Sequence, residues 1–305
     1  MSDPVPAVTE GEATGEIAAL FADIRAVYRV GAVNLIWRHL ATIPGALPWA
    51  WRVLRPLYVD GTISRSARAF GAELANPRVP RVPPETFAAL GLTADDMTQI
   101  RGVLAAYDRT NSMALIALIA LRGGLTSPTG ASSNALDSTE RAPTDEIVIP
   151  PQIPLAPQIP LAPQIPLAPQ IPLAPLIPLA PLIPLAEMPP HVAALVTRLN
   201  HFGTQQKTPI LASMYRHLSH WPPFLALAWT SLAPLQASGT LLESIATASD
   251  RARVHAARLI MAEDPPPAAS HAAIIQAIEL FIGDVLVKMI VICDILLKMT
   301  TYVDD

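Results

Sequence analysis

The chain has 305 residues, enough to bury one large or two medium hydrophobic cores. Its formal net charge of -4 and isoelectric point near 6.0 supply no basic field, so nucleic acid is not an expected partner. The single cysteine, Cys293, excludes an internal disulfide and suits a reducing compartment, which favours a cytoplasmic protein.

A mean hydropathy of +0.37 raises the question of membrane insertion. The apolar run 113–121 is too short to span a bilayer, and Lys288, Asp294 and Lys298 interrupt the run 285–299. The acidic N-terminus lacks the basic-then-apolar order of a signal peptide. We therefore expect a soluble chain with no membrane partner.

The first half begins as a series of short helices. Apolar residues recur at helical spacing over residues 17–28, which predicts the first helix. Pro44-Gly45 separates the next two helices, because proline lacks the amide hydrogen that a helix interior needs. A further helix is expected after Gly61-Thr62.

A long apolar helix is expected to close each half. In the first half, Thr93 is a candidate N-cap with Asp96 three residues later, and Gly123-Gly124 is expected to end the helix. In the second half, Ser270 is the candidate cap of a helix that runs towards Met299. No stretch alternates polar and apolar residues as a strand does, so the sequence predicts an all-α fold.

Part of the chain is written twice. Residues 38–64 recur as residues 216–242, 178 positions later, with 12 of 27 aligned residues identical and no gap. The match predicts an internal duplication in which two helical repeats, 1–124 and 191–305, pack as a pseudo-dimer. Any functional site is then expected where the repeats meet.

A proline-rich tract lies between the repeats, within a predicted linker of residues 125–190. Residues 151–174 are Pro-Gln-Ile-Pro-Leu-Ala four times, and residues 175–186 are Pro-Leu-Ile-Pro-Leu-Ala twice. A proline at every third position matches the three-residue turn of polyproline II. At about 3.1 Å per residue the tract could reach roughly 110 Å, far more than a crossing between packed halves needs. We interpret it as a linker expanded by copying, with a ligand for a proline-binding groove as the alternative.

Short segments outside residues 125–190 carry a resemblance to a known family. In the first half they are Ile24-Arg25, Arg29-Val30, Arg38, Leu40-Ala41-Thr42, Pro44-Gly45, Leu47-Pro48, Ala50-Trp51-Arg52, and the helix 101–121 with Asn111. In the second half they are Ser213, Leu218, Trp221-Pro222 and Leu232-Ala233-Pro234. Together they resemble the group I 2-haloacid dehalogenases, all-α enzymes that hydrolyse both enantiomers of 2-halocarboxylic acids.

The resemblance implies a site between two helical repeats. There an aspartate activates a water that attacks the halogen-bearing carbon with inversion and without an ester intermediate, and an asparagine from the other half positions water and substrate. Asn111 falls on the asparagine's position. The aspartate's position follows Ser213, where this chain has Met214, and the first repeat has Ile36 at the equivalent place. A thioether cannot accept a proton at neutral pH.

Other residues could supply the base. Asp108 lies three residues before Asn111 on the same predicted helix and is the candidate relocated base, with a solvated charge as the alternative interpretation. His39 and His217 occupy equivalent places in the two repeats, which favours packing over catalysis, and His201 and His220 are weaker candidates. Asp284–Lys288 and Asp294–Lys298 are interpreted as surface or interfacial ion pairs.

The sequence therefore favours a hydrolase that displaces halide from a small 2-halocarboxylic acid. Asn111 and Asp108 are the candidate catalytic residues, and Tyr107, Ser213 and Met214 are the candidate substrate-binding residues. No metal-ligand spacing, phosphate loop or dinucleotide fingerprint is present, so no metal or cofactor is expected. The alternative is a non-catalytic relative that binds a small organic acid or apolar ligand, and a homodimer is possible.

Overall fold

The computed structural model describes residues 5–126, 179–261 and 264–301, which all belong to one compact unit. The all-α prediction is confirmed, since the described residues form helices, turns and irregular segments and no strand. The helices of the first half are α1 (Gly15–Tyr28), α2 (Leu35–Leu40), α3 (Ala46–Val59), α4 (Thr62–Ala72), α5 (Pro84–Ala89) and α6 (Ala94–Thr126). Those of the second half are α7 (Pro190–Asn200), α8 (Ser213–Leu218), α9 (Pro222–Ala237), α10 (Thr240–Ala256), α11 (His271–Leu280) and α12 (Leu286–Thr300).

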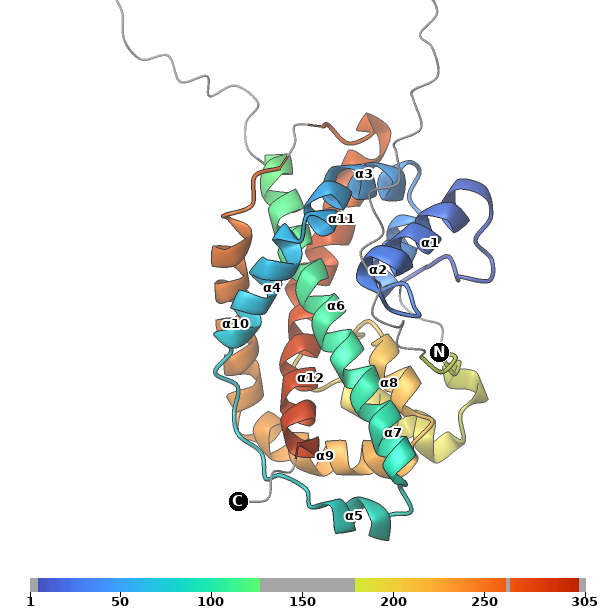
Figure 1. Cartoon of the computed structure of the whole chain (residues 1–305), viewed down its shortest axis with the longest axis vertical. Helices are drawn as coiled ribbons and strands as arrows, with labels where there is room; N and C mark the ends of the chain where they lie inside the picture. Colours follow the sequence, from blue (N-terminus) through green and yellow to red (C-terminus); the bar gives the residue numbers. More distant parts are fainter. Residues whose placement is uncertain (1–4, 127–178, 262–263, 302–305) are drawn as a thin grey trace, which may run out of the picture. The chain divides into compact units, whose positions relative to one another are not determined.

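Two antiparallel helices, α6 and α12, form the centre of this unit and make its most extensive helix contact (Figure 1). Their direction follows from side-chain contacts, because Arg122 near the end of α6 pairs with Glu279 of α11, whereas Asp108 faces Asp294 and Lys298 of α12. Twelve of the fifteen α12 residues are buried. A helix that is apolar on nearly all sides must be covered on all sides, and α4 and α10 pack against this pair.

Two helices of the first half have counterparts that begin 178 residues later. The bounds of α8 equal those of α2 plus 178, and α10 begins 178 residues after α4. Each of α4 and α10 follows a glycine in the left-handed region, Gly61 with φ 79° and Gly239 with φ 81°. The expected helix break at Pro44-Gly45 and the expected helix at Gly61-Thr62 are confirmed, because α3 begins at Ala46 and α4 at Thr62.

The start of the long first-half helix is as predicted, but its end is not. Thr93 and Asp96 form a reciprocal cap, in which the Thr93 amide donates to Asp96 Oδ2 at 2.8 Å and the Asp96 amide donates to Thr93 Oγ1 at 3.1 Å. The helix then continues through Gly123-Gly124 to Thr126, so the predicted end was wrong. Arg122 binds Glu279, and this tertiary contact holds the last turn in place against the helix-breaking tendency of glycine.

The long helix expected in the second half is divided. Ser270 does precede α11, but its hydroxyl donates to the carbonyl of Pro44 at 2.8 Å instead of capping the helix. A π-helical segment, Phe281–Val285, then separates α11 from α12. Such segments widen a helix by one residue and often lie at functional sites. This one borders the cavity described below.

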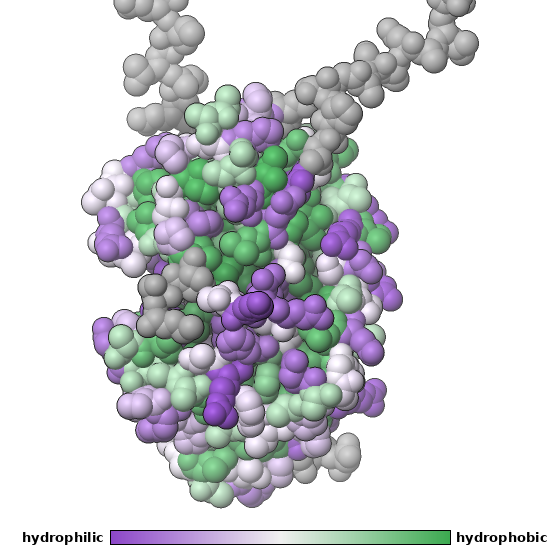
Figure 2. Space-filling view, turned by 180° about the vertical axis from the view of Figure 1, so that it is seen from behind, coloured by the Kyte–Doolittle hydropathy of each residue, from purple (hydrophilic) through white to green (hydrophobic). Residues whose placement is uncertain are grey.

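Most large apolar side chains of the described residues are buried in the core. Figure 2 shows hydrophobic residues interspersed with hydrophilic ones on one face. Within the described residues, few large apolar side chains are strongly exposed, and Ile260 is the most exposed of them at 88%. No helix in this part of the chain is long and apolar enough to cross a membrane.

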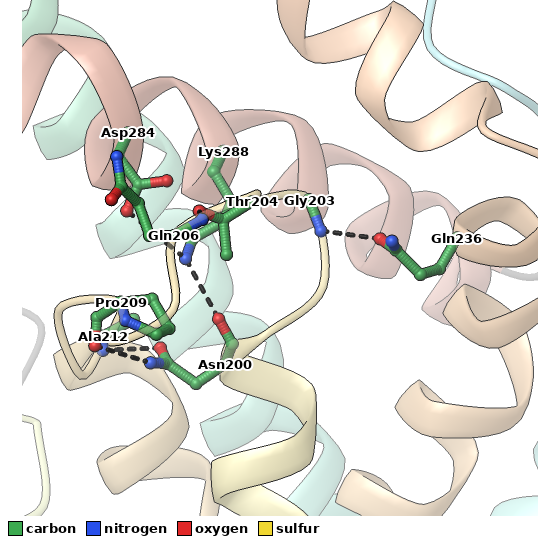
Figure 3. A network of polar contacts seen from close by, with 9 residues as sticks. All are labelled: Asn200, Gly203, Thr204, Gln206, Pro209, Ala212, Gln236, Asp284 and Lys288. Atoms are coloured by element: carbon green, nitrogen blue, oxygen red, sulfur yellow. Dashed lines mark hydrogen bonds and ion pairs between the residues drawn. The ribbon is translucent and has the colours of Figure 1, made fainter.

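We predict that Gly203→Ala destabilises the protein more than Gly239→Ala. Both glycines have positive φ, so alanine costs about 1–2 kcal/mol at either place. At Gly203 the new Cβ would also lie 2.5 Å from Ile245 Cδ1 and 3.2 Å from Lys288 Cγ, whereas Gly239 has no atom within 4 Å. Lys288 cannot move freely because its Nζ is anchored (Figure 3). We expect an additional loss of about 1–3 kcal/mol for Gly203→Ala in urea unfolding. Equal losses for the two variants would contradict this packing.

Candidate active site

A small buried cavity lies between α2, α6, α8, the π segment and α12. Ten of its twelve lining residues form pairs that are 178 positions apart: Asn34/Ala212, Leu35/Ser213, Ile36/Met214, Tyr107/Val285 and Asn111/Met289. The cavity offers about 30 Å³ to the centres of water molecules, and one water needs about 10–15 Å³ on this measure. It therefore has the size for water next to a small group.

A second cavity adjoins the first. Asn34, Tyr107 and Ser213 line both, and the second cavity is also lined by Arg38. Residues 179–186, the last part of the proline-rich tract, form one of its walls through two leucines. The described end of the tract is therefore packed against the helical core, and its remainder lies outside the described residues.

Asn111 is held in the wall of the first cavity. Its side chain is 5% exposed, and its Oδ1 accepts a hydrogen bond of 2.9 Å from Asn34 Nδ2. The Asn34 amide nitrogen also lies 3.2 Å from Thr110 Oγ1. Because Oδ1 is engaged as an acceptor, the donors of Asn111 Nδ2 are the groups that can orient a water or a substrate atom.

A buried positive charge reaches Ser213. Arg38 is 5% exposed, and its Nη2 donates to Ser213 Oγ at 3.3 Å. Both side chains line the second cavity. A guanidinium beside a hydroxyl is a donor set that suits a carboxylate.

Met214 lies against a thiol. The Met214 side chain is 1% exposed, and the Cys293 thiol on α12 approaches its Sδ at 3.2 Å. Burial raises the pKa of Cys293 well above its ordinary value, so this thiol stays protonated at neutral pH. Neither sulfur can therefore act as a general base in this wall of the cavity.

Asp108 lies apart from the other candidates. It lines neither cavity, and its nearest charged neighbours are Asp294 and Lys298 on α12. Burial, with a smaller contribution from Asp294, raises the pKa of Asp108 to about 6. The structure brings Asn111, Tyr107, Ser213 and Met214 together and leaves Asp108 at the packing of α6 on α12.

His217 contacts the site although its symmetric position favoured a packing role. Its Nδ1 lies 2.8 Å from the hydroxyl of Tyr107, and the ring is 1% exposed. His39, 178 positions before His217, has no such partner, because the residue 178 positions after Tyr107 is Val285. His39 Nδ1 instead contacts the carbonyl of Pro6 at 2.7 Å. Tyr107 and Val285, which are 178 positions apart, differ in residue type. This difference is the sequence signal that distinguishes His217 from His39.

A polar network positions the start of α8 (Figure 3). Asn200 Oδ1 accepts from the amide of Ala212 at 3.0 Å, and Lys288 Nζ donates to the Asn200 carbonyl at 3.1 Å. Lys288 is fully buried and lies 3.9 Å from Asp284 Oδ2, so this pair is in the interior and not at the surface. Burial lowers the pKa of Lys288. The network fixes the loop that delivers Ser213 to the cavity.

Comparison with known proteins gives one curated relative and a set of similar structures. A configuration-inverting 2-haloacid dehalogenase of Alcaligenes xylosoxydans xylosoxydans is 30% identical over 128 residues, which are 40% of this chain and 42% of that protein. The chain thus aligns with less than half of this relative's length. No family model matches the chain.

The similar structures agree over nearly the whole length. A D-2-haloacid dehalogenase in complex with L-LA superposes with a TM-score of 0.63 at 18% identity, covering 98% of this chain and 96% of that one. A D-2-haloacid dehalogenase mutant in complex with D-2-CPA gives a TM-score of 0.60 at 19% identity, with the same coverage. At this identity the likeness establishes the fold, and function has to be argued from the site.

We predict that Asp108→Asn stabilises the protein at neutral pH. The folded-state pKa of Asp108 is raised, to about 6, so ionisation above pH 4 costs more in the folded state than in the unfolded state. Stability is lost as the pH rises from about 4 to 6, and the full penalty applies above pH 6. Allowing for partial solvent exposure, we expect the variant to gain about 1–2 kcal/mol in urea unfolding at pH 8 and little at pH 3.5. A variant that is less stable at pH 8 would contradict this assignment.

Proposed function

We propose that this protein hydrolyses small 2-halocarboxylic acids in the two adjoining cavities. The observation that carries the proposal is the convergence of Asn111, Tyr107 and Ser213 on one water-sized space beside the buried guanidinium of Arg38. The similarity to 2-haloacid dehalogenases in sequence and in fold supports the same chemistry.

The proposed reaction is a direct displacement. A water held by Asn111 attacks C2 of the substrate, the halide leaves with the electron pair of the C–X bond, and the configuration at C2 inverts. Arg38 and Ser213 bind the carboxylate, and Tyr107 and Met214 contact the rest of the substrate. The water loses a proton to a base during the attack, and the product is a 2-hydroxy acid.

The proposed reaction needs a residue that accepts the proton of the attacking water. Asp108 is predicted as the base from its spacing to Asn111. To act as the base, its carboxylate must reach the attacking water, and its pKa of about 6 would leave the carboxylate ionised at neutral pH. It lines neither cavity. The test for Asp108 is the halide-release rate of Asp108→Asn, which a base role would reduce at least about 100-fold.

A specific observation supports the second candidate function, binding of a small organic acid without catalysis. The position where the resemblance places the catalytic carboxylate carries Met214, which packs on Cys293 in an apolar wall. Arg38 and Ser213 would then hold an acid that is not turned over.

We further propose that the two halves are duplicated repeats, 1–124 and 191–305, joined by a linker of residues 125–190. The coincident bounds of α2 and α8 and the five cavity-lining pairs at a spacing of 178 residues support this. Residues 127–178 of this linker lie outside the described residues, and residues 125–126 are the end of α6. A homodimer and a cytoplasmic location remain predictions.

We predict that wild type releases halide from 2-chloropropionate and that Met214→Asp raises the rate. Aspartate would add a carboxylate to the cavity wall at the position following Ser213. We expect a gain of about tenfold or more above the raised pKa of this buried group, measured as chloride release near pH 9 for each enantiomer.

Met214→Asn is the matched control, because asparagine has the shape of aspartate and cannot accept the proton. An equal gain in Met214→Asn would show that side-chain size and not basicity limits the reaction. Absence of halide from all three proteins, with calorimetric binding of the acid intact, would favour the binding function.

A further inference from the structure

A hydrogen-bonded pair of side chains lies at the cavity and has no role in the proton transfer of the reaction described above. Tyr107 on α6 and His217 on α8 are joined by a hydrogen bond of 2.8 Å between the phenol oxygen and Nδ1. The Tyr107 side chain lines both cavities, together with Ser213. His217 lies behind it at 1% exposure and lines neither. The tyrosine therefore separates the imidazole from the space where a water would attack.

The tautomer of His217 follows from its second partner. The backbone of Ala180 lies beside the ring and favours the protonated form of His217, as a carbonyl acceptor near a ring nitrogen does. We therefore assign Nε2 as the protonated nitrogen, facing Ala180, and Nδ1 as the acceptor. The Tyr107 hydroxyl is then the donor to Nδ1. A base oriented by a third group is the arrangement that activates nucleophiles in many hydrolases.

The charges around His217 keep it neutral at physiological pH. Burial, the neighbouring His220 in the turn after α8 and the guanidinium groups of Arg216 and Arg38 lower the pKa of His217 to about 4. That value is close to the ordinary pKa of an aspartate, about 3.9. The imidazole is thus an unprotonated acceptor from about pH 5 upwards, as a catalytic carboxylate would be.

We propose that Tyr107 and His217 form the proton relay that replaces the carboxylate missing at position 214, an inference that rests on the proposed dehalogenation. As water attacks C2 and halide leaves with the C–X electron pair, the water proton passes to Tyr107 Oη. The Tyr107 proton passes at the same time to His217 Nδ1. The phenol remains neutral throughout, and the imidazolium loses its proton to solvent after product release.

The relay avoids a phenolate, which this site would not tolerate. Burial raises the pKa of Tyr107, with Cys293 on α12 adding to the effect and Arg38 opposing it, so a free tyrosinate is unfavourable at neutral pH. Concerted transfer to His217 removes the need for that state. Ala180 belongs to the last part of the proline-rich tract, so the tract contributes a positioning residue to the relay.

Two substitutions test the relay in the full-length protein with 2-chloropropionate. Tyr107→Phe removes the bridging hydroxyl, and His217→Gln keeps a donor and an acceptor but cannot bind a proton. We expect either change to lower kcat about 10²–10⁴-fold with KM changed by less than about threefold. The double variant should lose no more than the single ones, because both residues act as one unit.

The pH profile separates a relay from a structural role. For wild type we expect kcat to rise with pH through the His217 pKa of about 4 and then remain flat. For His217→Gln we expect no inflection there and a small residual rate that increases with hydroxide concentration. His220→Gln is the matched control, because His220 in the turn after α8 contacts the Pro181 carbonyl at 2.9 Å and lies outside the Tyr107–His217 hydrogen bond. It should retain the wild-type plateau rate, with the inflection at a higher pH because the charge of His220 no longer lowers the pKa of His217.

Nitrogen NMR of the His217 ring gives a readout independent of turnover. We expect a neutral ring with Nδ1 unprotonated from about pH 5 to 9, given the pKa of about 4. Protonation at Nδ1, or unchanged turnover in Tyr107→Phe and His217→Gln beside an active wild type, would overturn the relay alone. No halide from any form, with the ring in the expected state, would overturn the dehalogenation and the relay's role in it.

Discussion

The antiparallel contact of α6 with α12 is the constraint on which the rest of this structure depends. Helix α12 and residues 110–121 of α6 are buried on nearly every side, so both must be covered by other helices. A core that extends through the middle of the molecule leaves little room for polar groups, and each one that enters must find a partner. The cavities lie at the edge of this contact, where α2 and α8 approach it.

Several buried polar groups in this core are hydrogen-bonded to other polar groups of the protein. Asn111 Oδ1 accepts a hydrogen bond from Asn34, and Lys288 donates to the carbonyl of Asn200. These bonds also serve the site, because the first fixes the orientation of an amide in the cavity and the second holds the loop that leads to Ser213. A buried group that is fully hydrogen-bonded adds rigidity where chemistry requires precise geometry.

The electrostatics of the site favour an anion and disfavour a cation. Arg38 and Arg216 lower the pKa of His217 and, by the same field, would stabilise a bound carboxylate. A water molecule losing its proton is also favoured there. Because position 214 carries no carboxylate, the pocket is positively charged. A base in such a pocket is favoured if it is neutral before it accepts the proton, and an unprotonated imidazole is neutral.

Sequence patterns predicted local structure well where the cause was local. Proline at position 44, the capping pair Thr93 and Asp96, and glycine at positions 61 and 239 all act within a few residues of themselves, and helices begin where these signals place them. The end of α6 was missed because the Arg122–Glu279 contact joins residues 157 positions apart. The π segment was missed because no local signal marks it.

The sequence by itself determined the all-α class, the repeat spacing of 178 residues and the apolar residues at the two equivalent positions, Ile36 and Met214, because these follow from composition and register alone. Only the tertiary structure decided which polar side chains meet. In the folded chain Asp108 lies away from the cavity, and His217 is hydrogen-bonded to Tyr107. These two residues are 110 positions apart, so their contact depends on how α6 packs against α8.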